Sequence, residues 1–331
     1  MKIHSHYIRI IKAVLVLSML ILLWQYVKVI DPGEVSAALT KAGSGFGWII
    51  LSTFFAYALA TVGWWYCLSD ARARVSWAGL FMIRHMCETV GMFTPASVAG
   101  GDLLKVVLLK PYEVNPPTVA ASVVVSRLLM IVSQVCLLLC TVVWLFTNNK
   151  LNPKSLPAIS FTSITVFIVL AITVLFTGIK LRHRIWTTLA RNNARWLQLR
   201  AKIKEVYQEI GRFYNHYPRE LGIAFVLFNL HWIVGSLEFY IILKLFGYPV
   251  SLVDALLLDM GVIAIKAAGA FIPGQLGVEE LGNKMMLSLI GIASIPLWIS
   301  VSALRRTRQL FWILIGVLFY SIIARKKRAF L

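Results

Sequence analysis

Charged side chains interrupt several strongly apolar stretches of this sequence, and four of them recur with a regular spacing. Asp102 is followed 25 residues later by Arg127, and Glu280 is followed 25 residues later by Arg305. An ionised group is costly within a membrane, so it normally faces a partner, a cavity or a substrate. Two interpretations stay open: structural salt bridges, or guanidinium groups that bind an anionic headgroup while the acids gate the site or couple protons.

We favour anion contact for the arginines and a structural role for the acids of these pairs. The predicted substrate-binding cations are Arg127, Arg305, Arg306, Lys105 and Lys266, and the predicted gating or coupling carboxylates are Asp102, Glu279, Glu280 and Glu88. Arg84 and Glu88 lie four residues apart and could simply neutralise each other. The sequence contains no H-E-x-x-H, G-x-S-x-G or P-loop motif, so we expect no catalytic residue, metal or cofactor.

Two apolar segments that contain these charges are broken by proline and glycine. Residues 93–102 align with residues 271–280 at an offset of 178, which pairs Phe with Phe, Pro with Pro and acid with acid. At membrane depth, non-helical backbone is tolerated only inside protein or beside a water-filled cavity. The predicted broken-helix backbone comprises Pro95, Gly100, Gly101, Pro273, Gly274 and Gly277.

The elements that must position these residues are membrane helices. Hydrophobic residues make up 59% of the 331 residues and charged ones only 14%, which is more apolar than a soluble domain. We predict an all-α polytopic membrane protein, a single transmembrane domain over 1–331, with two Gly/Pro-broken segments at 76–110 and 252–295 that are either re-entrant hairpins or paired short crossings. The six apolar runs near the ~20 residues of a full span are 13–30, 46–69, 117–147, 158–179, 221–246 and 297–323.

The net charge of +19 is concentrated between the spans rather than on an aqueous domain, which argues against nucleic acid as a partner. The connector at 180–219 holds ten cations against Glu205 and Glu209, and its apolar residues recur on one helix face. Such a basic amphipathic helix fits a cytoplasmic membrane surface. The positive-inside rule then predicts a multi-pass protein of the cell inner membrane with both termini in the cytoplasm.

The two broken segments belong to two similar halves. The order of span, broken segment, acid, arginine and span is shared by residues 46–147 and 224–323. With the connector in the cytoplasm, the two halves cross the membrane in opposite senses, so we predict inverted repeats. Inverted repeats with Gly/Pro-interrupted helices are typical of transporters that work by alternating access.

The broken segments also carry a family resemblance. The strings Pro95-Ala-Ser-Val-Ala-Gly-Gly-Asp-Leu-Leu-Lys105, Ser126-Arg127-Leu128 and Pro273-Gly-Gln-Leu-Gly-Val-Glu-Glu280 resemble the lysylphosphatidylglycerol synthetase transmembrane-region family, also called flippase-like. The resemblance implies lipid movement between leaflets, without the soluble aminoacyltransferase domain and its synthetase activity. Gln275 and Glu279 depart from the common pattern, so the headgroup preference does not transfer.

The leading hypothesis is therefore a lipid translocase for an anionic, aminoacylated or isoprenoid-linked lipid. The alternatives are a membrane-embedded lipid-modifying enzyme and an accessory scaffold subunit for a lipid or glycan enzyme. The expected partner is a membrane lipid; candidate protein partners are a second copy of the chain, a glycosyltransferase or an aminoacyltransferase.

Overall fold

The computed structural model describes residues 32–93, 97–147, 194–269, 275 and 277–329, and the regular elements among them are all helical. The expected spans at 13–30 and 158–179 lie outside these residues, as do Pro95, Pro273 and Gly274. The all-α prediction is confirmed for the described part, whereas the total of six full spans stays a prediction.

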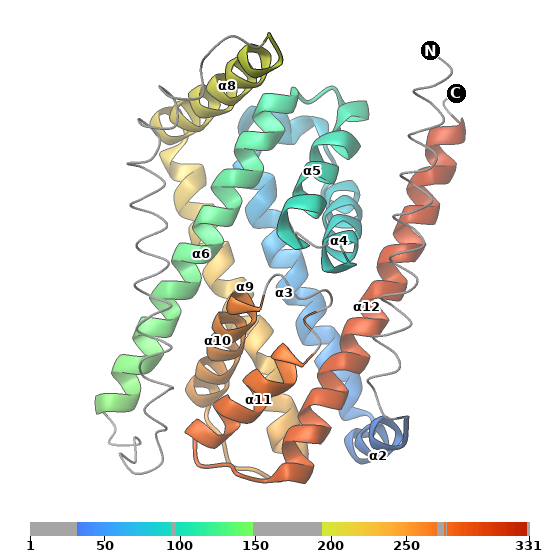
Figure 1. The fold of residues 1–331 in the computed structure, drawn as a ribbon, viewed down its shortest axis with the longest axis vertical. Coiled ribbons are helices and arrows are strands. Elements are labelled where there is room, and N and C mark those ends of the chain that lie inside the picture. Colours follow the sequence, from blue (N-terminus) through green and yellow to red (C-terminus); the bar gives the residue numbers. More distant parts are fainter. Residues whose placement is uncertain (1–31, 94–96, 148–193, 270–274, 276, 330–331) are drawn as a thin grey trace.

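Four long helices run side by side along the molecule (Figure 1). They are α3 (Gly45–Cys67), α6 (Pro116–Thr147), α9 (Pro218–Leu245) and α12 (Ile295–Ala329). By length and composition, α3, α6 over Pro116–Leu145 and α9 could cross a membrane. The fourth, α12, is the longest and carries Arg305, Arg306 and Arg308 in its first half. Each of the four begins and ends close to the bounds that the apolar runs predict.

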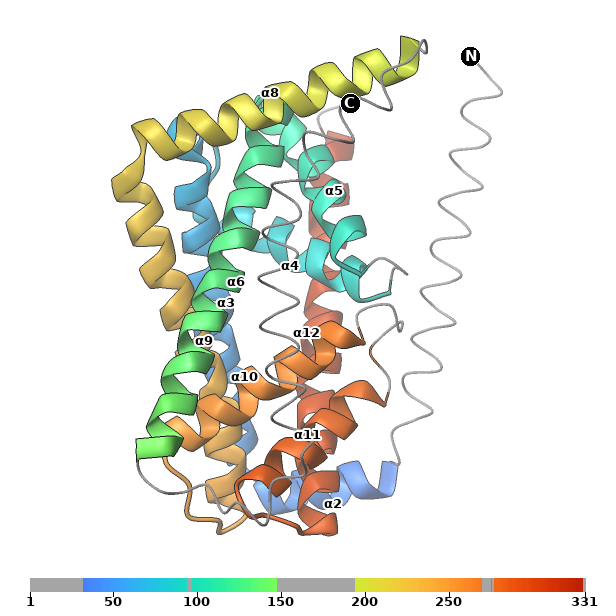
Figure 2. The same ribbon diagram turned by 60° about the vertical axis from the view of Figure 1, so that its left-hand side comes forward.

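Two pairs of short helices occupy the two broken segments. The first pair is α4 (Trp77–Phe93) and α5 (Ser97–Leu109), and the second is α10 (Leu252–Ala268) and α11 (Val278–Leu289). Each pair starts at one end of the bundle and turns back near the middle, and the two pairs start from opposite ends (Figures 1 and 2). A capping box, in which Ser251 and Asp254 each bond the other's backbone amide, starts α10. Gly277, with φ +80°, caps the start of α11 and therefore lies at a helix break, as predicted.

Two of the glycines expected to break the first segment lie within a helix instead. Gly100 and Gly101 belong to α5, and the break precedes them. A Cβ added at Gly101 would lie 2.4 Å from the backbone carbonyl oxygen of Cys87 on α4. Gly101 therefore serves close packing of α5 on α4, which needs the missing side chain rather than an unusual backbone.

Small residues also bring α3 and α9 together. A Cβ at Gly63 would lie 2.8 Å from the ring of Phe228, and one at Gly45 would lie 2.5 Å from the side chain of Leu245. The start of α3 thus meets the end of α9, so the two helices are antiparallel. In membranes, where apolar burial gives little drive, such close contacts are what hold helices together.

Each short-helix pair has its own apolar core. Near α8, the core includes Trp64, Leu80, Leu109, Val119 and Phe228. At the opposite end, the core includes Ile49, Phe239, Leu257, Met260 and Leu304. The long helices α3 and α9 contribute to both cores, so they form the shared frame on which the two pairs are mounted.

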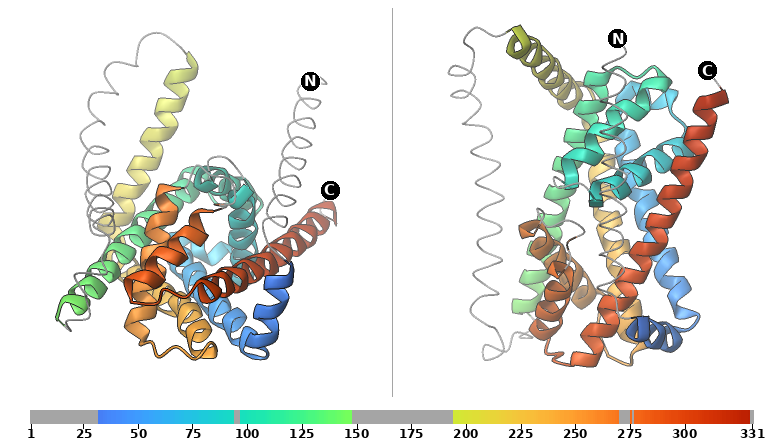
Figure 3. Two further views of the ribbon diagram at one scale, coloured as in Figure 1. Left: turned by 60° about the horizontal axis from the view of Figure 1, so that its bottom comes forward. Right: turned by 45° about the vertical axis from the view of Figure 1, so that its right-hand side comes forward.

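A separate amphipathic helix, α8 (Ala194–His216), lies across one end of the bundle and extends beyond it (Figures 2 and 3). It covers the C-terminal half of the predicted basic connector. Its buried face includes Phe213, while Ile203, Tyr207 and Tyr214 form an exposed stripe at helical spacing. Short 3₁₀ turns, η1 (Ser69–Arg74) and η2 (Lys110–Tyr112), lie at the same end, and α2 (Pro32–Ala42), which the sequence did not predict, lies at the other (Figure 1).

Candidate functional site

The carboxylate of Glu279 is the centre of a buried charge cluster near the turn of the second short-helix pair. Glu279 is 2% exposed. Its Oε2 accepts hydrogen bonds from Lys266 Nζ at 2.9 Å and from Gln309 Nε2 at 2.7 Å, and its Oε1 accepts one from Arg305 Nε at 3.1 Å. Side chains from α10 and α12 therefore converge on one residue in the first turn of α11.

The guanidinium group of Arg305 lies among three carboxylates. Its Nη1 lies 3.2 Å from Asp259 Oδ1 and 3.3 Å from Glu238 Oε2, in addition to the bond from Nε to Glu279. The same group lies 4.2 Å from the centre of the Phe239 ring. A cation buried to 3% exposure persists only because these partners replace its hydration.

The neighbouring Arg306 ties the turn before α11 to α12. Its Nε and Nη2 donate to the two oxygens of Glu280 at 2.6 and 2.9 Å, a bidentate pair, and Nη2 also donates to the carbonyl oxygen of Gln275 at 3.2 Å. Gln275 has φ +52°, a conformation that only a minority of non-glycine residues adopt. The arginine thus holds both the backbone of the turn and the helix that follows it.

We call this set the C-terminal charge cluster, and it is balanced in sign. Arg308 completes it, with Nε 2.7 Å from Glu238 Oε1. Within the part of the chain that the structure describes, its members are the cations Lys266, Arg305, Arg306 and Arg308 and the carboxylates Glu238, Asp259, Glu279 and Glu280. Four positive charges face four negative ones, so the cluster carries no excess charge for a ligand to neutralise.

A second set, the N-terminal charge cluster, lies on the first short-helix pair and α6. Asp102 accepts a bond from Lys105 Nζ at 2.7 Å, and Arg127 Nε and Nη2 donate to its two oxygens at 3.1 and 3.2 Å. On α4, Arg84 Nη2 lies 2.7 Å from Glu88 Oε1. Three cations here face two carboxylates. The side chains of Arg127 and Glu88 are 31% and 28% exposed, the largest values in this cluster.

Polar contacts across α3, α4 and α12 connect the two clusters. Tyr57 on α3 accepts a bond from Arg308 at its hydroxyl, at 3.3 Å, and one from Arg84 at its carbonyl oxygen, at 3.5 Å. Nearby, the ring nitrogen Nε2 of His85 bonds the carbonyl oxygen of Trp312 at 2.8 Å, and the indole of Trp312 donates to Thr53 at 2.9 Å. The first short-helix pair is therefore attached to α12 directly through the His85–Trp312 bond and indirectly through Tyr57 of α3.

The structure brings the predicted residues into these two clusters. Asp102 and Arg127, which are 25 residues apart, do form a pair. In the second half the pairing is offset by one residue: Arg305 pairs with Glu279, and Glu280 pairs with Arg306. Lys105, Lys266 and Glu88 also lie in the clusters, each in an ion pair. The structural interpretation of the acids therefore has direct geometric support.

The predicted site left out five contributors, which are Tyr57, Glu238, Asp259, Arg308 and Gln309. Asp259 binds Arg305, Gln309 binds Glu279 and Tyr57 binds Arg308. Asp259 could have been found, since it is an acid within an apolar run of α10. Tyr57 and Gln309 carry no such signal, because neutral polar residues are common in membrane helices. In the described ranges, no group of three or more His, Cys, Asp and Glu residues could hold a metal ion.

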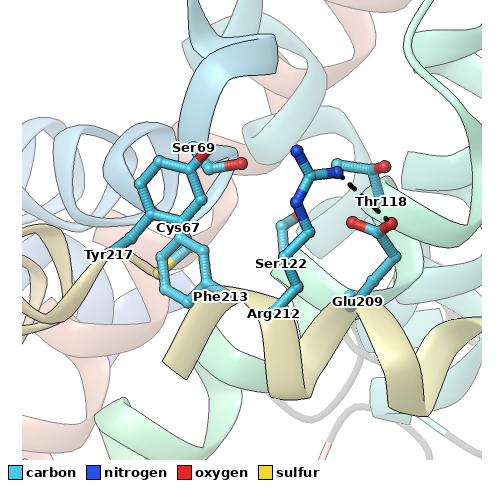
Figure 4. Close-up of a pocket in the computed structure, with 9 residues that line it drawn as sticks. Cys67, Ser69, Thr118, Ser122, Glu209, Arg212, Phe213 and Tyr217 are labelled. Carbon is cyan, nitrogen blue, oxygen red and sulfur yellow. Dashed lines mark ion pairs between the residues drawn. The ribbon is translucent and has the colours of Figure 1, made fainter. Parts of the chain in front are cut away.

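A shallow pocket outside both clusters lies where α8 crosses the ends of α3 and α6 (Figure 4). Its walls are formed by Cys67, Ser69, Thr118, Ala121, Ser122, Glu209, Arg212, Phe213 and Tyr217. Its two charged groups, Glu209 and Arg212, lie 3.9 Å apart as an ion pair. They neutralise each other, so the pocket offers no excess charge to a ligand.

The long apolar helices, the short pairs turning back between them and the buried ion pairs define a polytopic α-helical membrane protein. Over nearly its whole length the chain matches one family description, the lysylphosphatidylglycerol synthase TM region, at residues 9–324. The chain belongs to that family, which confirms the resemblance of its motifs and associates it with membrane lipids. No curated protein and no solved structure matches the chain.

Proposed function

We propose that the chain is a lipid translocase, a transporter rather than an enzyme, which moves a membrane lipid between leaflets by alternating access. The observation that carries the proposal is the pair of short-helix hairpins that start from opposite ends of the bundle and turn back near its middle (Figures 1 and 2). Interrupted helices that meet near the midplane are where transporters of this architecture bind their substrates.

Charged groups at the two hairpins support a substrate with a charged headgroup. The proposed headgroup contacts are Lys105, Arg127, Lys266, Arg305 and Arg306, and the proposed gates are Glu88, Asp102, Glu279 and Glu280. Each acid already pairs with a cation, so a headgroup phosphate would compete with a carboxylate for the same donors. That exchange gives the lipid a way to release one hairpin from the long helix beside it.

The two halves are proposed to be inverted repeats, 46–147 and 224–323. Their helices follow the same order of long, short, short and long. Moreover, α3 runs in the opposite sense to α9, and α6 runs in the opposite sense to α12 (Figure 1). A common fold used twice in opposite orientations gives two states of similar energy, which alternating access requires. The basic α8 supports a cytoplasmic position for its end of the bundle, and hence an inner-membrane protein with both termini in the cytoplasm.

The test is lipid movement in vesicles that contain the purified full chain. We expect fluorescent analogues of an anionic, an aminoacylated or an isoprenoid-linked lipid to become accessible to a membrane-impermeant quencher faster than in protein-free vesicles. Arg127→Gln should slow this movement, whereas Lys110→Gln, which removes an exposed cation outside both clusters, should not. If none of the three lipid classes moved, the translocase proposal would fail; a chemically altered lipid would favour an enzyme instead.

A further inference from the structure

The two charge clusters differ in charge balance. In the C-terminal cluster four cations face four carboxylates, whereas in the N-terminal cluster Arg84, Lys105 and Arg127 face only Glu88 and Asp102. The N-terminal cluster therefore holds one uncompensated positive charge among the described residues. An uncompensated cation in a membrane interior is costly, so an anion that bound there would be stabilised.

The arginines of the two clusters also differ in access. The side chain of Arg127 is 31% exposed, compared with 4% for Arg305 and Arg306. Within the described ranges, Arg127 has one acidic partner, Asp102, whereas Arg305 has three. Its Nε and Nη2 make that pair, and among the described residues its Nη1 has no hydrogen-bond partner. Arg127 alone among these three arginines combines an open side chain with an uncommitted donor.

We propose that Arg127 binds the phosphate of the transported lipid headgroup, while Arg305 and Arg306 serve to lock the second hairpin to α12. Lys105, 4% exposed and bonded to Asp102, would add its positive charge from behind. A planar guanidinium matches the oxygens of a phosphate, which would take over donors now held by Asp102. The inference rests on the proposed function and narrows its headgroup contacts to the first half of the molecule, so that Arg305 and Arg306 keep only their ion-pair role.

Binding of a short-chain lipid to the purified full chain in detergent tests this assignment. The probe is dihexanoyl-phosphatidylglycerol, and the readout is the thermal unfolding midpoint from tryptophan fluorescence, which rises as a ligand binds the folded state. Dihexanoylglycerol, which lacks phosphate, and inorganic phosphate are the comparison ligands. We expect the phospholipid alone to raise the midpoint. An equal rise with dihexanoylglycerol or with inorganic phosphate would overturn the assignment of a lipid phosphate.

Variants of opposite expected sign separate binding from structural support. Arg127→Gln should raise the dissociation constant of the probe by about tenfold, the scale of one lost charge-assisted contact. Arg127→Lys keeps the charge but not the planar guanidinium, so its dissociation constant should lie between those of Arg127→Gln and the wild type. Asp102→Asn should strengthen binding, because it removes the carboxylate that competes for Arg127. Lys110→Gln, which removes an exposed cation on η2, should leave the dissociation constant of the probe unchanged.

Two results would overturn the assignment: unchanged binding in Arg127→Gln, or equal losses in Arg127→Gln and Asp102→Asn, which would show that the pair only supports the fold. The vesicle assay separates this inference from the translocase proposal. Binding of the short-chain phospholipid through Arg127 without lipid movement in vesicles would refute transport alone. Lipid movement that is insensitive to Arg127→Gln would refute the headgroup contact alone.

Discussion

Glu279 is the residue on which the second hairpin depends most. Lys266, Arg305 and Gln309 all donate to its carboxylate, and the surrounding side chains leave it 2% exposed. Removal of one member of a buried ion pair is far more harmful than removal of the whole pair, because the remaining charge stays in a poor solvent. Its neighbour Glu280, which is 22% exposed and among the described residues forms an ion pair with Arg306 alone, offers a comparison in the same helical turn.

We expect Glu279→Gln to lower the free energy of unfolding by about 3 kcal/mol, because it leaves two cations short of a counter-charge. Glu280→Gln should cost clearly less, since Glu280 itself is 22% exposed and the buried Arg306 keeps Glu279, Gln309 and the carbonyl oxygen of Gln275 as neighbours. The thermal unfolding midpoint of each variant in detergent measures the difference. Equal shifts for the two variants would contradict the central place of Glu279.

At this scale the sequence predicted the cluster members better than their contacts. The equal spacing of Asp102 with Arg127 and of Glu280 with Arg305 identified residues that do lie in ion pairs. It identified the arginine that Asp102 binds but not the one that Glu280 binds, because one residue along a helix turns a side chain by about 100°. That choice depends on how α12 is rotated against α11, a tertiary property that spacing alone does not contain.

The short-helix pairs are the elements that distinguish this fold from a simple bundle. Their turns were predicted from proline and glycine, and the helices on either side were found where expected. Gly101, however, acts within α5 rather than at a turn. A single sequence does not distinguish a glycine that permits an unusual backbone from one that permits a close approach, since both need only the absence of a side chain.

Gly101→Ala should destabilise the protein, by about 1–3 kcal/mol, because the added Cβ would lie 2.4 Å from a backbone oxygen of α4 that cannot rotate away. Gly211→Ala is the matched control on α8, where a Cβ would meet nothing within 4 Å. The gain in helix propensity there should instead stabilise by about 0.5–1 kcal/mol. Unfolding midpoints would decide, and stabilisation by both variants would refute tight α4–α5 packing.

The attachment of α8 to the bundle should weaken at alkaline pH. The hydroxyl of Tyr217 donates a hydrogen bond to Asp70 on η1, and this bond raises the pKa of the phenol above its ordinary value. Because the folded pKa is the higher one, the contribution of the bond is complete below the unfolded pKa of about 10. It is lost as the pH rises through the folded value.

Tyr217→Phe should therefore have a lower unfolding midpoint than the wild type at pH 8, with the difference disappearing at higher alkaline pH. Tyr214→Phe, three residues earlier on α8, is the control, because that side chain is 72% exposed. A difference between wild type and Tyr217→Phe that stayed constant from pH 8 to pH 12 would exclude the tyrosine–aspartate bond as its cause.

For the whole molecule, the decisive property is that the two hairpins start from opposite ends. The loop between α5 and α6 contains Asn115, and the loop between α11 and α12 contains Ala293. Both residues are exposed, and they lie at opposite ends of the bundle. The distribution of positive charge, which reports which loops share a side of the membrane, predicts inverted repeats, and the opposite starting ends of the two hairpins agree with that prediction. The sequence could not predict α2, whose position depends on contacts with α12 rather than on a local pattern.

Cysteines at these two loops should react from opposite sides of the membrane. In a chain whose exposed Cys136 and Cys140 are replaced by serine, a membrane-impermeant maleimide should label Asn115→Cys from one side only and Ala293→Cys from the other. Labelling in intact cells and in inverted membrane vesicles provides the comparison. Labelling of both positions from the same side would rule out the inverted arrangement.

The three arginines of α12 also have a consequence for how the protein is made. A helix with Arg305, Arg306 and Arg308 near the middle of its apolar run 297–323 would enter a bilayer poorly by itself, since each arginine costs about 2.5–3.5 kcal/mol at the centre of a membrane span. Their counter-charges lie on α9, α10 and α11, which the ribosome synthesises earlier. We expect insertion of α12 to require that α9, α10 and α11 are already present at the insertion machinery, so that α12 also acts as a checkpoint on the integration of these preceding helices.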